Sequence, residues 1–295
     1  MPRGFLSLDH RRIEAVAKAL SDMGWETFPL LDRVEPEYEV LRRLYESSGV
    51  RATLVVGMGA AIVDFQLGAG GAEEFWRCLS ELLEQKGFAL EDLSEARRLL
   101  FDFLDRCKAN SRLKSLKRER LTKFFEGFAK DLWSEAYEFF NERPDEVWSR
   151  LSRSMGGRPE AKTVVFAMKV LDIVSAIATG SYALFRRLPP IPVDEHVRRM
   201  SHYSGVVVGE PHLFKAEVYR EAWAKVSQEV TKRLGRVVSP LRLDSLLWQL
   251  SKEASRHGYA KSRAVPAMAK YLVDNANLPD EVAFKVALEL SVNME

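Results

Sequence analysis

The chain has 295 residues, of which 46% are hydrophobic and 29% charged, a balance typical of a folded globular protein rather than a disordered one. The formal net charge is only +2, so overall charge alone does not indicate a nucleic-acid partner. The longest apolar run, residues 163–178, is interrupted by Lys169 and Asp172, and the N-terminus lacks a signal-peptide core. We therefore predict an intracellular protein of the cytoplasm or nucleoid.

Amphipathic helices are predicted along nearly the whole chain. Apolar residues recur with helical spacing in five segments, namely residues 10–24, 73–87, 94–108, 162–180 and 239–258. Many predicted helices end in glycine, and several open with Ser, Asp or Pro, which are helix start and stop signals. The strand candidates are short and few, at residues 52–63 and 204–210, and no βαβ alternation follows them. We predict an all-α fold, a single unit over residues 1–295 made of two helical lobes with an active-site cleft between them.

A local surplus of positive charge lies in the middle of the chain. Between Lys108 and Lys123 there are seven Lys or Arg residues and a single acidic one, Glu119. Such a surplus is typical of a surface that contacts phosphates, and a solvated helix face is the alternative. The candidate phosphate contacts are Lys114, Lys117 and Arg118.

A helix–hairpin–helix element is predicted at about residues 145–175. One helix begins at Asp145, a turn follows at residues 155–159, and a second helix opens near Glu160. Gly156 and Gly157 in this turn allow positive φ angles and leave backbone N–H groups exposed at the start of the second helix. With Arg158 beside them, these groups are suited to holding a DNA phosphate without reading bases, although a purely structural turn has the same pattern.

Two residues in the following stretch have the chemistry of a covalent DNA-cleaving site. Lys162 opens an apolar helix, and a lysine in its neutral form is a nucleophile that forms Schiff bases. Asp194 follows Pro190 and Pro192, whose fixed φ angles hold its carboxylate in place, where it can stabilise a positively charged sugar. Asp194 is equally suited to cap the helix that follows it.

Several segments together resemble the archaeal GO glycosylase family (AGOG), which are 8-oxoguanine DNA glycosylase/lyases of the helix–hairpin–helix superfamily. The similar segments are GGRPEAKTVVFAMKVLD at 156, PIPVDEHVRRMSHYSG at 190, SPLRLDSLLWQLSKEA at 239, EPEYEVLRRL at 35 and DFQLGAGGAEEFW at 64. Their order and spacing cover most of residues 10–257, while the tail beyond Gly258 and a segment between Lys123 and Asn141 have no clear match.

The resemblance implies a role for each matching residue. Lys162 and Asp194 are the implied catalytic pair, in a reaction that removes 8-oxoguanine and then cleaves the strand by β-elimination through a Schiff base. The implied base-binding residues are Glu37, Asp64, Trp76, Phe166, Pro192, Asp244 and Trp248. Among them, Phe166 and Trp248 would sandwich the everted base, Asp244 would accept hydrogen bonds from it, and the Trp76 indole would donate one. The chain departs from the family's pattern at Glu37, where the family commonly has Gln, and at Asp64, which opens the stretch DFQL.

The sequence also bears on cofactors and partners. The two cysteines, Cys78 and Cys107, are too few for a four-cysteine iron–sulfur cluster, and the five scattered histidines show no zinc spacing, so no cofactor or metal is expected. The expected partner is DNA containing 8-oxoguanine or abasic sites, acted on by a monomer, and the resemblance and charged composition point to an archaeal, thermophilic source. The alternatives are a glycosylase of the same superfamily for another damaged or mismatched base and a non-catalytic helical DNA-binding module.

Overall fold

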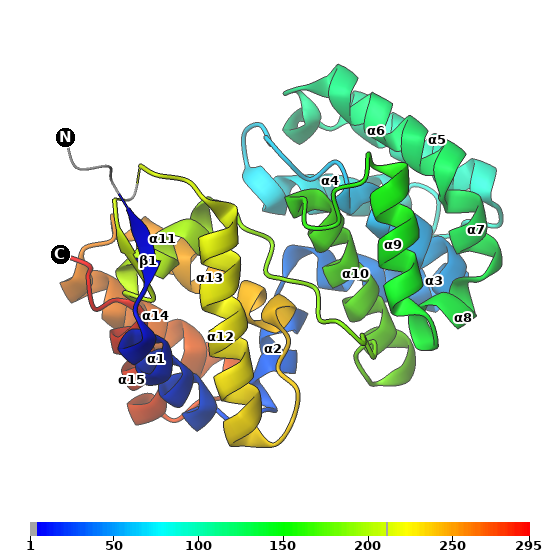
Figure 1. Ribbon diagram of the computed structural model, residues 1–295. Helices are drawn as coiled ribbons and strands as arrows, with labels where there is room; N and C mark the ends of the chain where they lie inside the picture. Colours follow the sequence, from blue (N-terminus) through cyan, green and yellow to red (C-terminus); the bar gives the residue numbers. More distant parts are fainter. Residues whose placement is uncertain (1–4, 211) are drawn as a thin grey trace. The chain divides into compact units, whose positions relative to one another are not determined.

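The computed structural model describes residues 5–210 and 212–295. Within these ranges the chain forms fifteen α-helices, one short 3-10 helix and a single two-stranded sheet (Figure 1). The prediction of an all-α fold is therefore confirmed. The described residues form two compact units, with residues 5–35 and 189–295 in unit 1 and residues 36–188 in unit 2. The predicted cleft stays a prediction.

Unit 2 is a bundle of helices built around one long helix. Its elements are α3 (Pro36–Ala61), α4 (Gly71–Glu84), α5 (Leu93–Arg106), η1 (Lys108–Asn110), α6 (Lys114–Gly127), α7 (Ala129–Ser134), α8 (Ala136–Asn141), α9 (Pro144–Ser154) and α10 (Lys162–Thr179). Helix α3 packs against α4, α5, α7, α8 and most extensively against α10 (Figure 1). The segment between Lys123 and Asn141 that lacked a match forms the end of α6 and the short helices α7 and α8, which close one side of this core.

The strand predicted at residues 52–63 is wrong, because this stretch forms the second half of α3. Nearly every residue of this half is buried, so its apolar positions follow neither the helical nor the strand period and the pattern is ambiguous. The helix bends at Gly49, whose φ of 72° lies outside the helical region. A Cβ atom at Gly57 would lie 2.6 Å from a Leu41 carbon and 2.8 Å from a Val170 carbon, so glycine is what allows α10 to approach α3 closely.

Unit 1 combines both ends of the described chain. Its elements are β1 (Leu6–Leu8), α1 (His10–Asp22), α2 (Thr27–Arg33), α11 (Glu195–Tyr203), β2 (Val207–Gly209), α12 (Ala216–Leu234), α13 (Pro240–Arg256), α14 (Lys261–Ala276) and α15 (Asp280–Leu290). Strands β1 and β2 pair antiparallel, with Leu6 opposite Gly209, which confirms the strand candidate at 204–210 in its central part. The tail beyond Gly258 forms α14 and α15, which pack on each other and contribute to the core of this unit.

Helix α10 is apolar and largely buried, yet it contains two charged side chains. Lys169 and Asp172 are 1% and 2% exposed. Burial raises the pKa of the Asp172 carboxyl to about 8, and the hydrogen bond that the Ala183 backbone N–H donates to it, 2.8 Å long, acts in the opposite direction. That bond ties the chain after α10 back to the helix.

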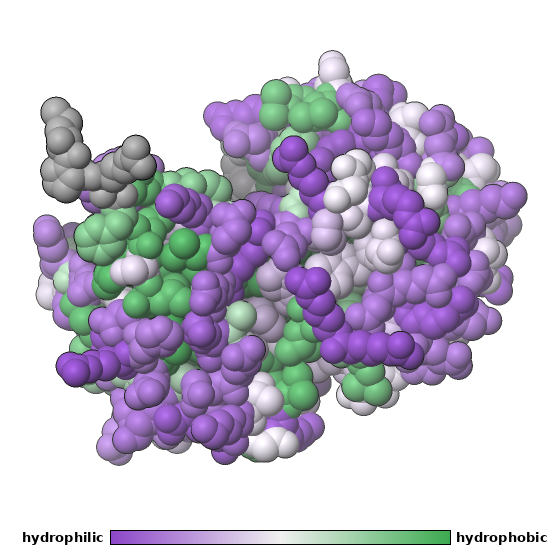
Figure 2. All heavy atoms as spheres, in the orientation of Figure 1, coloured by the Kyte–Doolittle hydropathy of each residue, from purple (hydrophilic) through white to green (hydrophobic). Residues whose placement is uncertain are grey.

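The surface of the protein is mostly polar. On the face shown in Figure 2, hydrophilic residues predominate and hydrophobic atoms appear in separate patches. The exposed aromatic side chains include Phe214 and Phe284, which are 60% and 45% exposed. Among the helices described, none combines the length and the apolar character needed to cross a membrane.

Candidate active site

The predicted helix–hairpin–helix element is formed by α9, a glycine turn and α10. Gly156 and Gly157 have φ angles of 96° and 79°, and the Gly157 N–H donates to the Ser152 carbonyl at 2.8 Å. The Trp148 indole N–H donates to the Pro159 carbonyl at 2.8 Å and thereby fixes the turn to α9. Both glycines are exposed, so the turn presents backbone at the surface, just before the first residue of α10.

Lys162 is that first residue of α10. The preceding residue, Ala161, occupies the N-cap position and has no side chain that could cap the helix. Anions and electron-rich groups are stabilised at such a helix start. The lysine is partly exposed, whereas Thr163 beside it is buried and accepts a hydrogen bond from the Arg120 guanidinium. Arg120 also donates to the Ile62 carbonyl at 2.9 Å, so it fixes the first turn of α10 to the end of α3.

Farther along α10, Phe166 and Lys169 lie beside Glu37 of α3. Phe166 is half-buried, and the Lys169 ammonium lies 5.7 Å from the centre of its ring. The same ammonium lies 3.8 Å from Glu37 Oε1, and both side chains of this ion pair are 1% exposed. Sequence reasoning identified Glu37 and Phe166 but gave Lys169 no role. The sequence does contain a sign of such a role. Lys169 interrupts an apolar helix seven residues after Lys162, a spacing that places it two turns along the same face.

Asp64 and Trp76 contact each other directly. The Trp76 indole N–H donates to Asp64 Oδ2 at 3.2 Å, and both side chains are buried. The resemblance implied that this indole donates to a bound base, whereas here the Asp64 carboxylate accepts from it. Asp64, where the chain departs from the family's sequence pattern, therefore also determines the hydrogen bonding of Trp76.

The basic segment differs from its predicted role at Lys117. This side chain is 0% exposed, its ammonium donates to Asn110 Oδ1 at 3.0 Å, and burial lowers its pKa while the charge of Asp64 raises it. A fully buried ammonium cannot reach a DNA phosphate, so Lys117 is withdrawn from the candidate phosphate contacts. Lys114 and Arg118 do lie at the surface, where both pair with Asp105 at 3.0 and 2.6 Å.

Asp194 occupies the N-cap position of α11. Its Oδ1 accepts a hydrogen bond from the Val197 backbone N–H at 2.9 Å, so the capping role suggested by the sequence is present. Pro192 is buried and Asp194 is partly exposed. This hydrogen bond holds the Asp194 carboxylate in position at the start of α11.

Asp244 and Trp248 lie one turn apart on α13. Asp244 is 6% exposed, and Trp248 is partly exposed. The Trp248 ring packs edge-on against His196, with ring centres 5.9 Å apart, and the Lys252 ammonium lies 5.1 Å from the ring centre. His196 Nδ1 also lies 3.0 Å from the Oγ atom of Ser251, which is on α13 like Trp248. His196, two residues after Asp194, therefore links the start of α11 to the aromatic side chain of α13.

The candidate residues fall into two sets, one in each unit. Unit 2 contains Glu37, Asp64, Trp76, Lys162 and Phe166, and unit 1 contains Pro192, Asp194, Asp244 and Trp248. In the part of the chain that the structure describes, no group of His, Cys, Asp and Glu side chains is arranged to hold a metal ion.

Comparison with known proteins relates this arrangement to one enzyme family. A family model described as AGOG, N-glycosylase/DNA lyase, matches residues 17–281. Curated relatives named N-glycosylase/DNA lyase include one from Methanopyrus kandleri, 26% identical over 73% of this chain and 79% of its own. Another, from Thermococcus kodakarensis, is 25% identical over 81% of this chain and 84% of its own.

A solved structure supports the assignment of the fold. It is the 8-oxoguanosine complex of Pa-AGOG, an 8-oxoguanine DNA glycosylase from Pyrobaculum aerophilum, with a TM-score of 0.68, 22% identity, and coverage of 95% of this chain and 97% of that one. The family model spans most of the chain and includes α14 and the start of α15, which lie beyond the segments that resemble the family in the sequence. The chain belongs to the AGOG family of N-glycosylase/DNA lyases.

Proposed function

We propose that this protein removes 8-oxoguanine from DNA and then cleaves the strand at the resulting abasic site by β-elimination. The observation that carries the proposal is the position of Lys162, the first residue of an apolar helix, directly after the exposed Gly-Gly turn. The family assignment and the names of the relatives support the same chemistry.

The proposed reaction begins with attack of the neutral Lys162 amine on C1′ of the damaged nucleotide. The C1′–N9 bond breaks and the base leaves with its bonding electrons, and ring opening gives an iminium between C1′ and Nζ. Loss of a proton from C2′ then expels the 3′ phosphate, which is the β-elimination step. In this proposal the Asp194 carboxylate stabilises the cationic sugar and assists proton transfer.

Recognition of the base is assigned to the remaining candidate residues. Flat faces of Phe166 and Trp248 would stack on the everted base, at about 1–3 kcal/mol per base, which offsets a cost of a few kcal/mol for everting it. Asp244 would accept from the polar edge that distinguishes the lesion, where N7 carries a proton. The buried Glu37 carboxylate accepts only, so it suits the N1–H and N2–H₂ donors on the Watson–Crick edge. Pro192, Asp64 and Trp76 complete the proposed base-binding set, and the Trp76 indole would have to exchange its hydrogen bond to Asp64 for one to the base.

Binding of the DNA backbone is assigned to the glycine turn and to basic side chains beside it. The glycine turn and the exposed Arg158 side chain are suited to one phosphate. The Gly156 and Gly157 N–H groups donate to the Arg153 and Ser152 carbonyls at 3.2 and 2.8 Å, so each would have to exchange that bond for the phosphate. Lys114 and Arg118 remain candidates, and each would have to exchange its contact with Asp105 for a phosphate. The protein is proposed to act as a monomer inside the cell.

Borohydride trapping tests the proposed function. Because reduction makes the iminium permanent, the wild-type chain is expected to become covalently attached to a duplex containing 8-oxoguanine or an abasic site. A duplex of the same sequence with guanine is the control and should give little product. A helical DNA-binding module without catalysis would give no covalent product on any of the three duplexes, and that result would contradict the proposal.

Replacing Glu37 by Gln is expected to lower the stability of the fold and to leave the preference for 8-oxoguanine over guanine unchanged. The excision ratio of 8-oxoguanine over guanine should change little, because the two bases share the Watson–Crick edge. The free energy of unfolding should fall by a few kcal/mol, since the buried Lys169 ammonium loses a charged partner. Single-turnover excision and denaturant unfolding measure the two effects.

Glu39→Gln is the matched control for this variant. Glu39 is two residues further along α3, exposed, and paired with Arg42 at 2.7 Å, so its loss should change the unfolding free energy by less than about 1 kcal/mol. A selective collapse of the preference for 8-oxoguanine in Glu37→Gln would show that Glu37 reads the edge that carries the lesion.

A further inference from the structure

A cavity adjoins Asp194 within unit 1, and none of the roles proposed above uses it. Its volume is about 460 Å³, and it is lined by Val193, Asp194, Glu195, Arg198, His212 and Phe214. One wall is the start of α11, and the other is formed by His212 and Phe214, which precede α12. We call this cavity the Phe214 pocket.

The Phe214 ring is held in an exposed position. It is 60% exposed, and it stacks on the buried Tyr219 ring, with centres 6.0 Å apart and planes at 25°. The Tyr219 hydroxyl lies 3.0 Å from His202 Nε2, which anchors it to α11, and it donates to the Leu213 carbonyl at 3.4 Å. An exposed phenylalanine on a fixed support presents a flat apolar face that is ready to stack on another ring without ordering the chain first.

The opposite wall of the pocket is polar, and its charged groups are the carboxylates of Asp194 and Glu195 and the guanidinium of Arg198. Arg198 donates to both carboxylate oxygens of Glu195, at 2.8 and 2.7 Å, and these bonds hold the pKa of Glu195 at about 2, so the pair stays ionised. His212 lies 3.0 Å from a Glu210 oxygen at the rim. A flat aromatic face opposite hydrogen-bonding groups of both kinds is the environment that a nucleobase requires, since its faces stack and its edges donate and accept.

We propose that the Phe214 pocket binds an unpaired nucleobase of the DNA other than the lesion itself, by stacking it on Phe214. The inference rests on the proposed function, in which Asp194 faces the sugar of the damaged nucleotide. Everting that nucleotide removes a stacking partner from its neighbours and a pairing partner from the opposite base. A pocket that shares Asp194 as a wall lies where such a base needs a new stacking partner.

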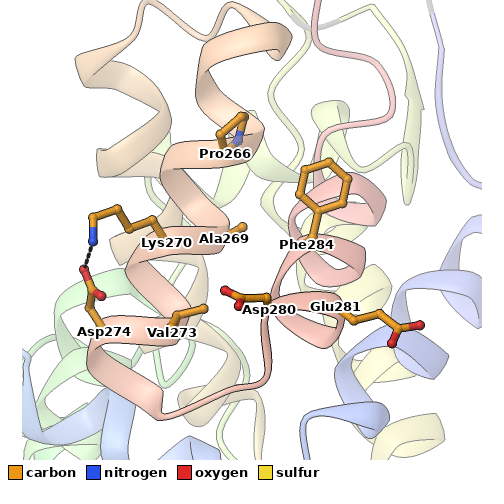
Figure 3. A pocket seen from close by; sticks show the side chains of 8 residues that line it. All are labelled: Pro266, Ala269, Lys270, Val273, Asp274, Asp280, Glu281 and Phe284. Atoms are coloured by element: carbon orange, nitrogen blue, oxygen red, sulfur yellow. Dashed lines mark hydrogen bonds and ion pairs between the residues drawn. The ribbon is translucent and has the colours of Figure 1, made fainter.

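A second exposed phenylalanine in the same unit provides a matched control. Phe284 lies in a groove between α14 and α15, and Asp274, Asp280 and Glu281 are among the other residues that line it (Figure 3). The one lysine of this groove, Lys270, already pairs with Asp274 at 2.8 Å. None of the residues proposed to contact DNA lines this groove, so loss of the Phe284 ring should not affect DNA binding.

The test compares Phe214→Ala with Phe284→Ala in the full chain. The probes are a duplex with a tetrahydrofuran abasic analogue, the corresponding single strand, and free 8-oxoguanosine. Phe214→Ala is expected to weaken duplex binding about tenfold, the range of one lost base stack, and to leave binding of free 8-oxoguanosine unchanged. Phe214→Tyr should restore duplex binding and Phe214→Leu should not, because leucine is apolar but not flat.

The single-strand arm distinguishes the two sources of the base. A tenfold loss that persists on the single strand identifies a neighbour of the lesion in its own strand, and a loss confined to the duplex identifies the opposite base. Duplex binding by Phe214→Ala within twofold of wild type, full rescue by leucine, or an equal loss for free 8-oxoguanosine would each overturn the inference. Failure of the proposed function would give a different result from failure of this inference. In that case the wild-type chain itself would neither excise 8-oxoguanine nor bind 8-oxoguanosine.

Discussion

Lys162→Gln is expected to abolish both base release and strand cleavage while DNA binding persists. Glutamine keeps most of the length of the side chain but has no nucleophilic amine, so neither displacement at C1′ nor the iminium is accessible. A loss of more than about 10⁴-fold in single-turnover rate is expected, on the scale seen when a catalytic nucleophile is removed. Release of free base and nicking of the strand should be measured separately, with binding followed by fluorescence anisotropy.

Lys270→Gln is the control for that variant. Lys270 lies on the surface of α14, paired with Asp274, and its loss should leave both activities intact. If Lys162→Gln still released the base at the wild-type rate and lost only strand cleavage, water would be the attacking group at C1′ and the lysine would act only in the lyase step. Normal rates for both steps would remove Lys162 from the chemistry.

Much of the fold could be predicted because it depends on local patterns. The helical spacing of apolar residues identified α1, α4, α5, α10 and α13, and the Gly-Gly turn was correctly placed between α9 and α10. The error at residues 52–63 arose where burial on all sides removes the periodic signal. The residues themselves do not reveal that α10 packs against this half of α3, because that contact is set by the tertiary structure.

The burial and contacts of the charged residues were harder to predict from the sequence than the helices. A count of positive charges grouped Lys117 with Lys114 and Arg118, although Lys117 is spaced at i, i+4 and i+7 with Leu121 and Phe124, the buried positions of α6. That spacing was a readable sign of its burial. By contrast, no sequence pattern indicated that Asp64 accepts from the Trp76 indole, because the contact depends on the path of the chain between α3 and α4.

Asp194→Asn is expected to reduce excision without disturbing the fold. Asparagine is as good an N-cap as aspartate, so its side-chain oxygen can still accept from the Val197 N–H and α11 should begin as before. What the variant loses is the negative charge proposed to stabilise the sugar cation. The expected loss is of order 10²–10⁴ in single-turnover rate, equivalent to about 3–5 kcal/mol of transition-state stabilisation.

Asp9→Asn isolates the capping role, because Asp9 caps α1 of the same unit through bonds to the Arg11 and Arg12 N–H groups at 2.9 and 3.0 Å. Both variants should unfold at nearly the wild-type temperature, and only Asp194→Asn should lose activity. Because the substitution is the same and both sites are helix caps, a difference in rate between them can be assigned to the charge of Asp194 rather than to helix stability. Excision by Asp194→Asn within about twofold of wild type would leave Asp194 with its structural role alone, and the cation would then have to be stabilised by another group.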